Sequence, residues 1–230
     1  MLTDIEIEAV RLSLRVGFWS TLVSMPIAIL TAWILSRLRF PGRGLLDAIV
    51  HVPLVIPPVA VGYLLLVLLG RNGLIGKLLY EDFNLTVVFT WEGAAIASAV
   101  MAFPLVVRSI RLSLETVDRG LETAARTLGS SPARVFFSIT LPLIAPGIVT
   151  GALLGFARSI GEFGATITFV SNISGETRTI PLALYTAVQM PGGDTNALRL
   201  LIISVAIALI ALFASDILTR RFTQHKPENT

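Results

Sequence analysis

Residues 122–142 read ETAARTLGSSPARVFFSITLP, polar in the first half and largely apolar in the second. A helix over 120–128 is predicted to end at Gly129, because glycine tolerates best the left-handed conformation that follows many helices. Ser131 then supplies a capping oxygen, and Pro132 takes the first position of a second helix, where its missing N–H costs nothing. The stretch is therefore predicted to form an elbow of two helices.

The composition around this elbow is that of a membrane protein. Of the 230 residues, 54% are hydrophobic and 14% are charged, and the mean hydropathy is +0.79, outside the usual range of soluble domains. The absence of cysteine excludes disulfides and thiolate chemistry. His51 and His225 are too far apart to form a metal site by themselves. The net charge of +3 is attributed to loops at a membrane surface, so no nucleic-acid partner is expected.

Charge-poor windows of about 20 residues predict five membrane-spanning helices. Their ranges are 16–36, 48–70, 85–107, 141–160 and 200–218. A shorter uncharged stretch, 179–193, is expected to lie against the outer face or dip into it. The predicted fold is an all-α polytopic membrane protein with one domain over 1–230, in which the elbow loop 118–142 joins the third and fourth spans.

The basic residues predict which side of the membrane each loop occupies. With the N-terminus outside, the inside segments 37–47, 108–134 and 216–230 carry 11 of the 18 Lys and Arg residues in 53 positions. The outside segments carry the other 7 in 79 positions. This difference in density favours an outer N-terminus and an inner C-terminus. The acidic start of the chain is unlike a signal peptide and is expected to remain in the mature protein.

The elbow is predicted to present a surface of low relief. Ala124 and Ala125 are small, and Glu122, Arg126 and Arg134 are expected as charges at its rim. Such a surface suits a shallow groove on another protein. An ordinary amphipathic loop between two spans is the alternative.

The elbow also resembles a known signature. Permeases of binding-protein-dependent ABC importers, of the MetI-like type, carry E-A-A, three residues, glycine, nine residues and I-x-L-P in a cytoplasmic loop. This sequence has Thr123-Ala124-Ala125, then Gly129, then Ile139-Thr140-Leu141-Pro142 at the same spacings. It departs from the signature at Thr123, which stands at the glutamate position, with Glu122 one place earlier.

This resemblance implies that the elbow is a cytoplasmic coupling helix seated in a cleft of a separate ATP-binding subunit. Closure of two such subunits on ATP would bias the membrane-spanning part between two states. The residues expected to carry the coupling are Glu122, Thr123, Ala124, Ala125, Arg126, Gly129, Arg134, Ile139, Leu141 and Pro142.

A second resemblance concerns the cargo. Residues 156–185 (FARSIGEFGATITFVSNISGETRTIPLALY), together with 51–66 and 191–194, are similar to the oxyanion branch of this family, most closely to the molybdate permeases of Gram-negative bacteria. This implies a homodimer in the bacterial inner membrane, two ATP-binding subunits on its cytoplasmic side and a periplasmic molybdate-binding protein. ATP and Mg would be bound by the partner, and no cofactor is expected in this chain. Sulfate and tungstate permeases share much of the pattern and remain alternatives.

Two groups of residues bear on the translocation pathway and on helix packing. Pro53, Pro57 and Pro58 interrupt the second span, as a pore-lining kink or as a structural kink in a packed bundle. In the fourth span a glycine recurs every four residues, which favours close approach of another helix over a pore lining. These glycines are Gly147, Gly151 and Gly155.

Two charges lie near the outer end of the fourth span. Arg158 and Glu162 are spaced i, i+4 and can pair on one helix face. Arg158 would attract an anion, and Glu162 is expected mainly to hold Arg158 or a contact between elements; a purely structural ion pair is the alternative. The surrounding Gly161, Phe163 and Gly164 are expected to form part of an outer gate.

Other classes of membrane protein have little support in the sequence. It lacks the HExxH, GxSxG and GxxxxGK[ST] patterns, so neither hydrolytic chemistry nor ATP hydrolysis is expected in this chain. His51 is expected to be a packing or interface residue. An ion-coupled secondary transporter would need carboxylates buried in mid-span and inverted repeats, and neither is found.

Overall fold

The computed structural model describes residues 3–223 and, for residues 215, 216 and 218–223, the backbone alone. The segment 224–230, which contains His225, lies outside the described residues. The described part of the chain is built of helices and loops without a strand, so the expected all-α class is confirmed. Four helices are long and apolar enough to cross a membrane, and a bent pair of helices raises this number to as many as five.

The first helix is longer than the predicted span 16–36. Helix α1 (Asp4–Arg37) begins at a capping box, in which Thr3 accepts a hydrogen bond from the Glu6 backbone N–H while the Glu6 side chain accepts one from Thr3 N–H. A capping box satisfies two free donors at a helix start. The charged N-terminal turns are therefore helical, although they lie outside the apolar window.

The second predicted span, 48–70, is divided into two helices. Helix α2 (Arg43–Val55) and helix α3 (Pro58–Leu69) meet at an angle of 116°. Pro57 and Pro58 cause the break, because neither can donate the hydrogen bond that would continue α2. Pro58 is the first residue of α3, where proline is favoured.

The third predicted span, 85–107, begins and ends later in the structure. A short helix, α4 (Leu74–Phe83), precedes it, and helix α5 runs over Trp91–Glu115. Thr90 caps α5 by accepting a hydrogen bond from Gly93 N–H at 3.2 Å. Glu92 therefore lies in the first turn, where a carboxylate is favoured by the helix dipole.

The elbow leads directly into the helix of the fourth predicted span, 141–160. Helix α6 (Arg119–Thr127) is followed by α7 (Pro132–Val135), a π-helical segment over Phe136–Thr140 and α8 (Leu141–Ile160). The remaining helices are α9 (Gly164–Val170), α10 (Ile180–Gln189) and α11 (Asp194–Thr223). Helix α10 is the short element expected within 179–193.

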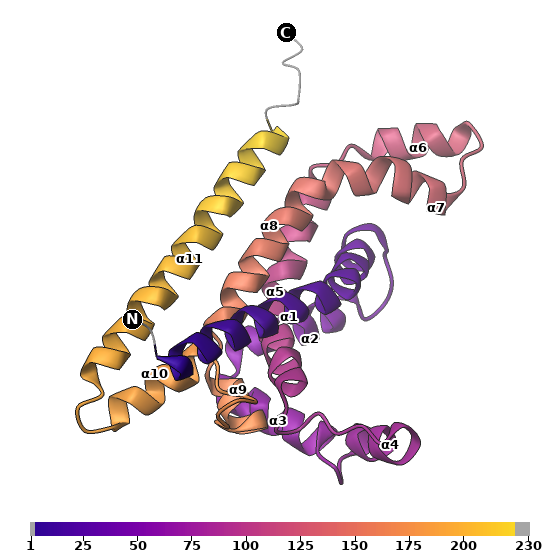
Figure 1. The fold of residues 1–230 in the computed structure, drawn as a ribbon. Coiled ribbons are helices and arrows are strands. Elements are labelled where there is room, and N and C mark those ends of the chain that lie inside the picture. The colour runs from indigo at the N-terminus through magenta and orange to yellow at the C-terminus, as the bar shows by residue number, and fades with distance from the viewer. Residues whose placement is uncertain (1–2, 224–230) are drawn as a thin grey trace.

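Helix α5 is the centre of the packing and contacts both α1 and α8, which also pack against each other. One apolar cluster joins α1, α3, α5 and α9, and a second joins α1, α2, α5 and α8. In Figure 1 the α6–α7 elbow projects at one end of the molecule, while α4, α9 and α10 lie toward the opposite end. The C-terminal end of α11 lies on the same side as the elbow (Figure 1).

Candidate functional site

The elbow has the capped ends that its sequence predicts. Asp118 begins α6 by accepting a hydrogen bond from Gly120 N–H at 2.8 Å. At the other end Gly129 adopts φ +87°, and the following N–H of Ser130 donates to Ala125 O at 3.1 Å. Ser131 caps α7 by accepting from Arg134 N–H at 3.3 Å. Both turns of the elbow are thus fixed by local hydrogen bonds.

The outward face of α6 is apolar and exposed. Leu121 is 50% exposed and Leu128 is 87% exposed, and the small Ala124 lies between them in sequence and is exposed as well. Spacings of three, four and seven residues place these side chains on one helix face. Large exposed apolar side chains gathered on one face are typical of a surface that binds another protein. The seven-residue spacing of the two leucines is the sequence signal from which this exposed apolar face could have been predicted.

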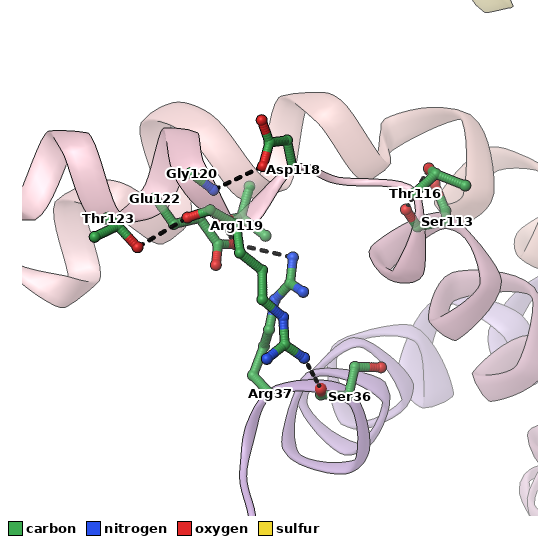
Figure 2. Close-up of polar contacts among 10 residues, drawn as sticks. Ser36, Arg37, Ser113, Thr116, Asp118, Arg119, Gly120, Glu122 and Thr123 are labelled. Atoms are coloured by element: carbon green, nitrogen blue, oxygen red, sulfur yellow. Dashed lines mark hydrogen bonds and ion pairs between the residues drawn. The ribbon is translucent and has the colours of Figure 1, made fainter.

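The inward face of α6 is attached to the rest of the chain by polar contacts (Figure 2). Glu122 Oε1 lies 3.1 Å from Arg37 Nη2 at the end of α1, and it accepts a hydrogen bond from Thr140 Oγ1 at 2.8 Å. Arg119 Nη2 donates to the Ser36 carbonyl at 3.0 Å. These contacts join α6 to the end of α1 and to the start of α8.

The expected position of Glu122 as a rim charge is therefore wrong. Its side chain is 18% exposed and that of its partner Arg37 is 9% exposed, because the ion pair draws Glu122 toward α1. Arg126 and Arg134 are exposed, as a rim requires. Thr123, at the glutamate position of the signature, is exposed and donates its hydroxyl to Arg119 O at 3.0 Å (Figure 2).

The last part of the signature lies where the elbow enters α8. Ile139 belongs to the π-helical segment, and Leu141 and Pro142 are the first residues of α8. A π-helical segment is rare and is often found at functional sites. Here it carries Thr140, which contacts Glu122.

At the other end of the molecule, the break between α2 and α3 meets the start of α9. A side chain on Gly164 would come within 2.8 Å of Pro58 Cβ, and one on Gly62 would come within 2.5 Å of Ala165 O. The structure thus brings together two predicted residues, Pro58 and Gly164. Pro53 lies inside α2, in the last turn before the break. Gly62 was missed, because a single glycine in an apolar run carries no sequence signal of a close contact.

The pair at the end of α8 forms as its spacing predicts. Arg158 Nη1 lies 2.7 Å from Glu162 Oε2, and the Glu162 side chain is 1% exposed. Its other oxygen accepts a hydrogen bond from Ala165 N–H in α9 at 2.8 Å. Glu162 therefore holds both Arg158 and the first turn of α9. Phe163 contacts Tyr185 of α10, with 5.1 Å between ring centroids, and Gly161 is exposed.

The three glycines of α8 all lie against α5. A side chain on Gly147 would collide with Ser113, and one on Gly155 would come within 2.7 Å of Val106 Cγ2. For Gly151 the nearest atom is Val106 O at 3.3 Å. The helices approach closely enough for Ser109 Oγ to donate to Gly147 O at 3.0 Å.

Two polar groups outside the predicted sites also connect distant helices. Glu6 Oε1 lies 3.1 Å from Arg199 Nε, so the buried Glu6 ties α1 to α11. Asp47 of α2 lies 3.0 Å from Arg111 of α5 and 3.3 Å from the ring of His51. Glu6 and Arg199 are 193 residues apart and Asp47 and Arg111 are 64 apart, and sequence spacing does not indicate such pairs.

Comparisons with known proteins show the family of the chain. The family model described as binding-protein-dependent transport system inner membrane component matches residues 24–224. The molybdenum transport system permease protein ModB of Escherichia coli K12 is 60% identical over 220 residues, which cover 96% of each chain. The sulfate transport system permease protein CysT of Salmonella typhimurium is 35% identical over 219 residues, which cover 94% of this chain and 77% of CysT.

The fold is shared with a solved transporter. A chain of the bacterial alginate ABC transporter, crystallised in complex with its alginate pentasaccharide-bound periplasmic protein, superposes with a TM-score of 0.75. The match covers 96% of this chain and 80% of that one, at 21% sequence identity.

Proposed function

The chain belongs to the family of binding-protein-dependent transport system inner membrane components, and from this premise we propose that it is the permease through which an ABC importer passes molybdate into the bacterial cytoplasm. A periplasmic binding protein delivers the anion, and a separate subunit hydrolyses ATP with its bound Mg. The observation that carries the choice of anion is the much higher identity to a molybdenum permease than to a sulfate permease.

The elbow is the part that receives work from the ATP-binding subunit. Its apolar face, with Leu121, Ala124 and Leu128, suits a shallow cleft on that partner. Because Glu122 joins α6 to Arg37 and Thr140, a displacement of the elbow moves the ends of α1 and α8 with it. A rigid connection of this kind can bias two states of the permease.

The elbow faces the cytoplasm, with the N-terminus in the periplasm and the C-terminus in the cytoplasm. The high density of arginine in the inner segments supports this orientation. In Figure 1 the elbow and the C-terminal end of α11 lie on the same side of the molecule, which is consistent with this orientation.

Two copies of the chain enclose the translocation pathway. The α2–α3 break and the start of α9 lie at the outer part of that pathway, and residues 161–164 contribute to its gate. Helix breaks are tolerated in membranes where protein or a water-lined path satisfies the freed backbone groups. Arg158 acts here through its pair with Glu162, because an unpaired carboxylate would repel a dianion.

Uptake by the reconstituted assembly tests the proposal. Labelled molybdate is supplied with the binding protein, and tungstate and sulfate are added as competitors. We expect uptake to require ATP hydrolysis and excess sulfate to compete weakly. A preference for sulfate or tungstate would show that molybdate is not the main substrate, without contradicting the proposed architecture of the importer. Uptake that continues without the ATP-binding subunit and stops with an uncoupler would instead indicate an ion-coupled transporter.

A further inference from the structure

A polar cavity lies between the end of α1, the inward face of α6 and the start of α7. Its volume is about 250 Å³. Three arginines, Arg37, Arg119 and Arg126, and one acidic residue, Glu122, are part of its lining. The cavity therefore has an excess of positive charge.

An apolar groove of about 490 Å³ continues from this cavity along α1. Trp33, Pro132 and Phe136 line both, so the two spaces adjoin. The ring of Trp33 meets that of Phe136 edge-on, with 6.3 Å between centroids. Phe137, which is 65% exposed, forms part of the far wall.

The groove covers much of the depth of one leaflet of a bilayer. It lines α1 from Pro26 to Trp33, and seven residues of α-helix rise about 10 Å. Half of a hydrocarbon core is about 15 Å thick. The aromatic residues lie between the apolar and the charged parts, as they do at membrane interfaces. The cavity thus has the polar character of a headgroup site and the groove the apolar character of an acyl-chain site.

The arginines of the cavity retain donors for a ligand. Arg37 contributes its charge, but it is paired with Glu122 and its Nε is buried, so the accessible donors belong to Arg119 and Arg126. Arg119 uses one nitrogen for the Ser36 carbonyl. Arg126 forms no ion pair or side-chain hydrogen bond with any described residue. Guanidinium groups with free donors are well suited to a phosphate.

We propose that the cavity and the groove together bind one anionic phospholipid, with its phosphate among Arg37, Arg119 and Arg126 and an acyl chain along Trp33 and Phe137. Basic pockets beside membrane helices are suited to anionic headgroups. The apolar groove selects a lipid over a free phosphate, which would leave the groove without an occupant. The bound lipid would connect α1 to α7, beside the contacts by which Glu122 joins α6 to Arg37 and Thr140.

Trp33 provides a reporter at the junction of the two spaces. The sequence has three tryptophans, so the Trp19→Phe, Trp91→Phe variant leaves Trp33 alone. The full chain is reconstituted in two series of phosphatidylethanolamine vesicles. One series contains phosphatidylglycerol with brominated acyl chains, and the other contains phosphatidylethanolamine with brominated acyl chains, over the same range of mole fractions. Bromine quenches tryptophan fluorescence on contact, so the curve of quenching against mole fraction reports how often each lipid occupies the groove.

We expect brominated phosphatidylglycerol to quench Trp33 at a roughly tenfold lower mole fraction than the zwitterionic lipid, the factor typical of one good charge-assisted hydrogen bond. Arg126→Gln in the same background should remove most of this preference. Arg39→Gln, which changes an exposed arginine outside the cavity, should retain it. Phe137→Ala should weaken quenching by the acyl chain without reversing the order of the lipids.

Three results would overturn the proposal. Equal quenching by the two lipids in the parent variant would show ordinary boundary lipid. An unchanged preference in Arg126→Gln would place the headgroup elsewhere. Relief of the quenching by millimolar glycerol 3-phosphate would show a site for a free phosphate compound in place of a lipid.

Discussion

Glu122 Oε1 lies 3.1 Å from Arg37 Nη2, across 85 residues of sequence. The same oxygen accepts a hydrogen bond from Thr140 Oγ1. One carboxylate therefore joins α6 to the end of α1 and to the segment that leads into α8. In the proposed mechanism this junction carries the motion of the elbow into the membrane.

Replacement of this carboxylate should uncouple ATP hydrolysis from transport. We expect Glu122→Gln to lower the molybdate imported per ATP hydrolysed several-fold, because Arg37 loses its counter-charge in a site where it is 9% exposed. The loss of a part-buried, charge-assisted contact costs about 1–3 kcal/mol. Glu115→Gln, at a 54% exposed glutamate paired with Arg111, serves as the control. A wild-type ratio in Glu122→Gln would contradict the role of the junction.

Disruption of the outward face should prevent assembly without unfolding the permease. Leu128 is 87% exposed, so Leu128→Asp should leave the thermal unfolding midpoint of the purified chain within a few degrees of wild type. We expect it to abolish co-purification of the ATP-binding subunit. The matched change Leu74→Asp, at a 77% exposed leucine at the start of α4, should retain the subunit. Capture of the subunit by Leu128→Asp would exclude this face as the docking surface.

The contact of α8 with α5 should tolerate no side chain at Gly147. Gly147→Ala places a Cβ against Ser113, and overpacking of this kind costs about 1–3 kcal/mol. Ser113→Gly in the same chain should recover most of the thermal stability, because it removes the colliding atoms. Gly44→Ala, in α2 with no atom within 4 Å of the added Cβ, should be neutral or stabilising. Equal melting curves for Gly147→Ala and wild type would show that α8 can move away from α5 at no cost.

The pair at the outer end of α8 should act through structure rather than by contact with the anion. Arg158→Gln leaves the Glu162 carboxylate, 1% exposed, without its cation, and we expect a marked loss of transport. Arg158→Gln with Glu162→Gln removes both charges and should recover most of it, with a near wild-type half-saturating concentration of molybdate. Recovery of the rate with a strongly raised half-saturating concentration would assign Arg158 to the anion instead.

Local features of the elbow were predictable from the sequence, and its tertiary contacts were not. Capping depends on residues a few positions apart, so Gly129 and Ser131 could be placed correctly. The ion pair of Glu122 with Arg37 could not be predicted, because a glutamate in a polar helix is equally compatible with an exposed surface position. The pair of buried Glu6 and half-buried Arg199 could not be predicted for the same reason.

The helix ends show a similar division. Windows of apolar residues located the membrane-crossing part of each helix, but capping decided where helices begin, as at Thr90 and Thr3. The prolines of the second span predicted an interruption. The size of the bend, 116°, depends on the packing of α3 against α9, which involves residues about 100 positions apart and is not contained in any local pattern.

The accessibility of one engineered cysteine tests the central claim, that the elbow is a cytoplasmic handle held by an ATP-binding subunit. The sequence has no cysteine, so Leu128→Cys introduces a single exposed thiol. A membrane-impermeant maleimide is applied to intact spheroplasts and to inverted membrane vesicles, with and without the ATP-binding subunit. We predict labelling in inverted vesicles alone, and protection when the subunit is bound. Labelling in intact spheroplasts, or labelling that the subunit does not reduce, would contradict the account.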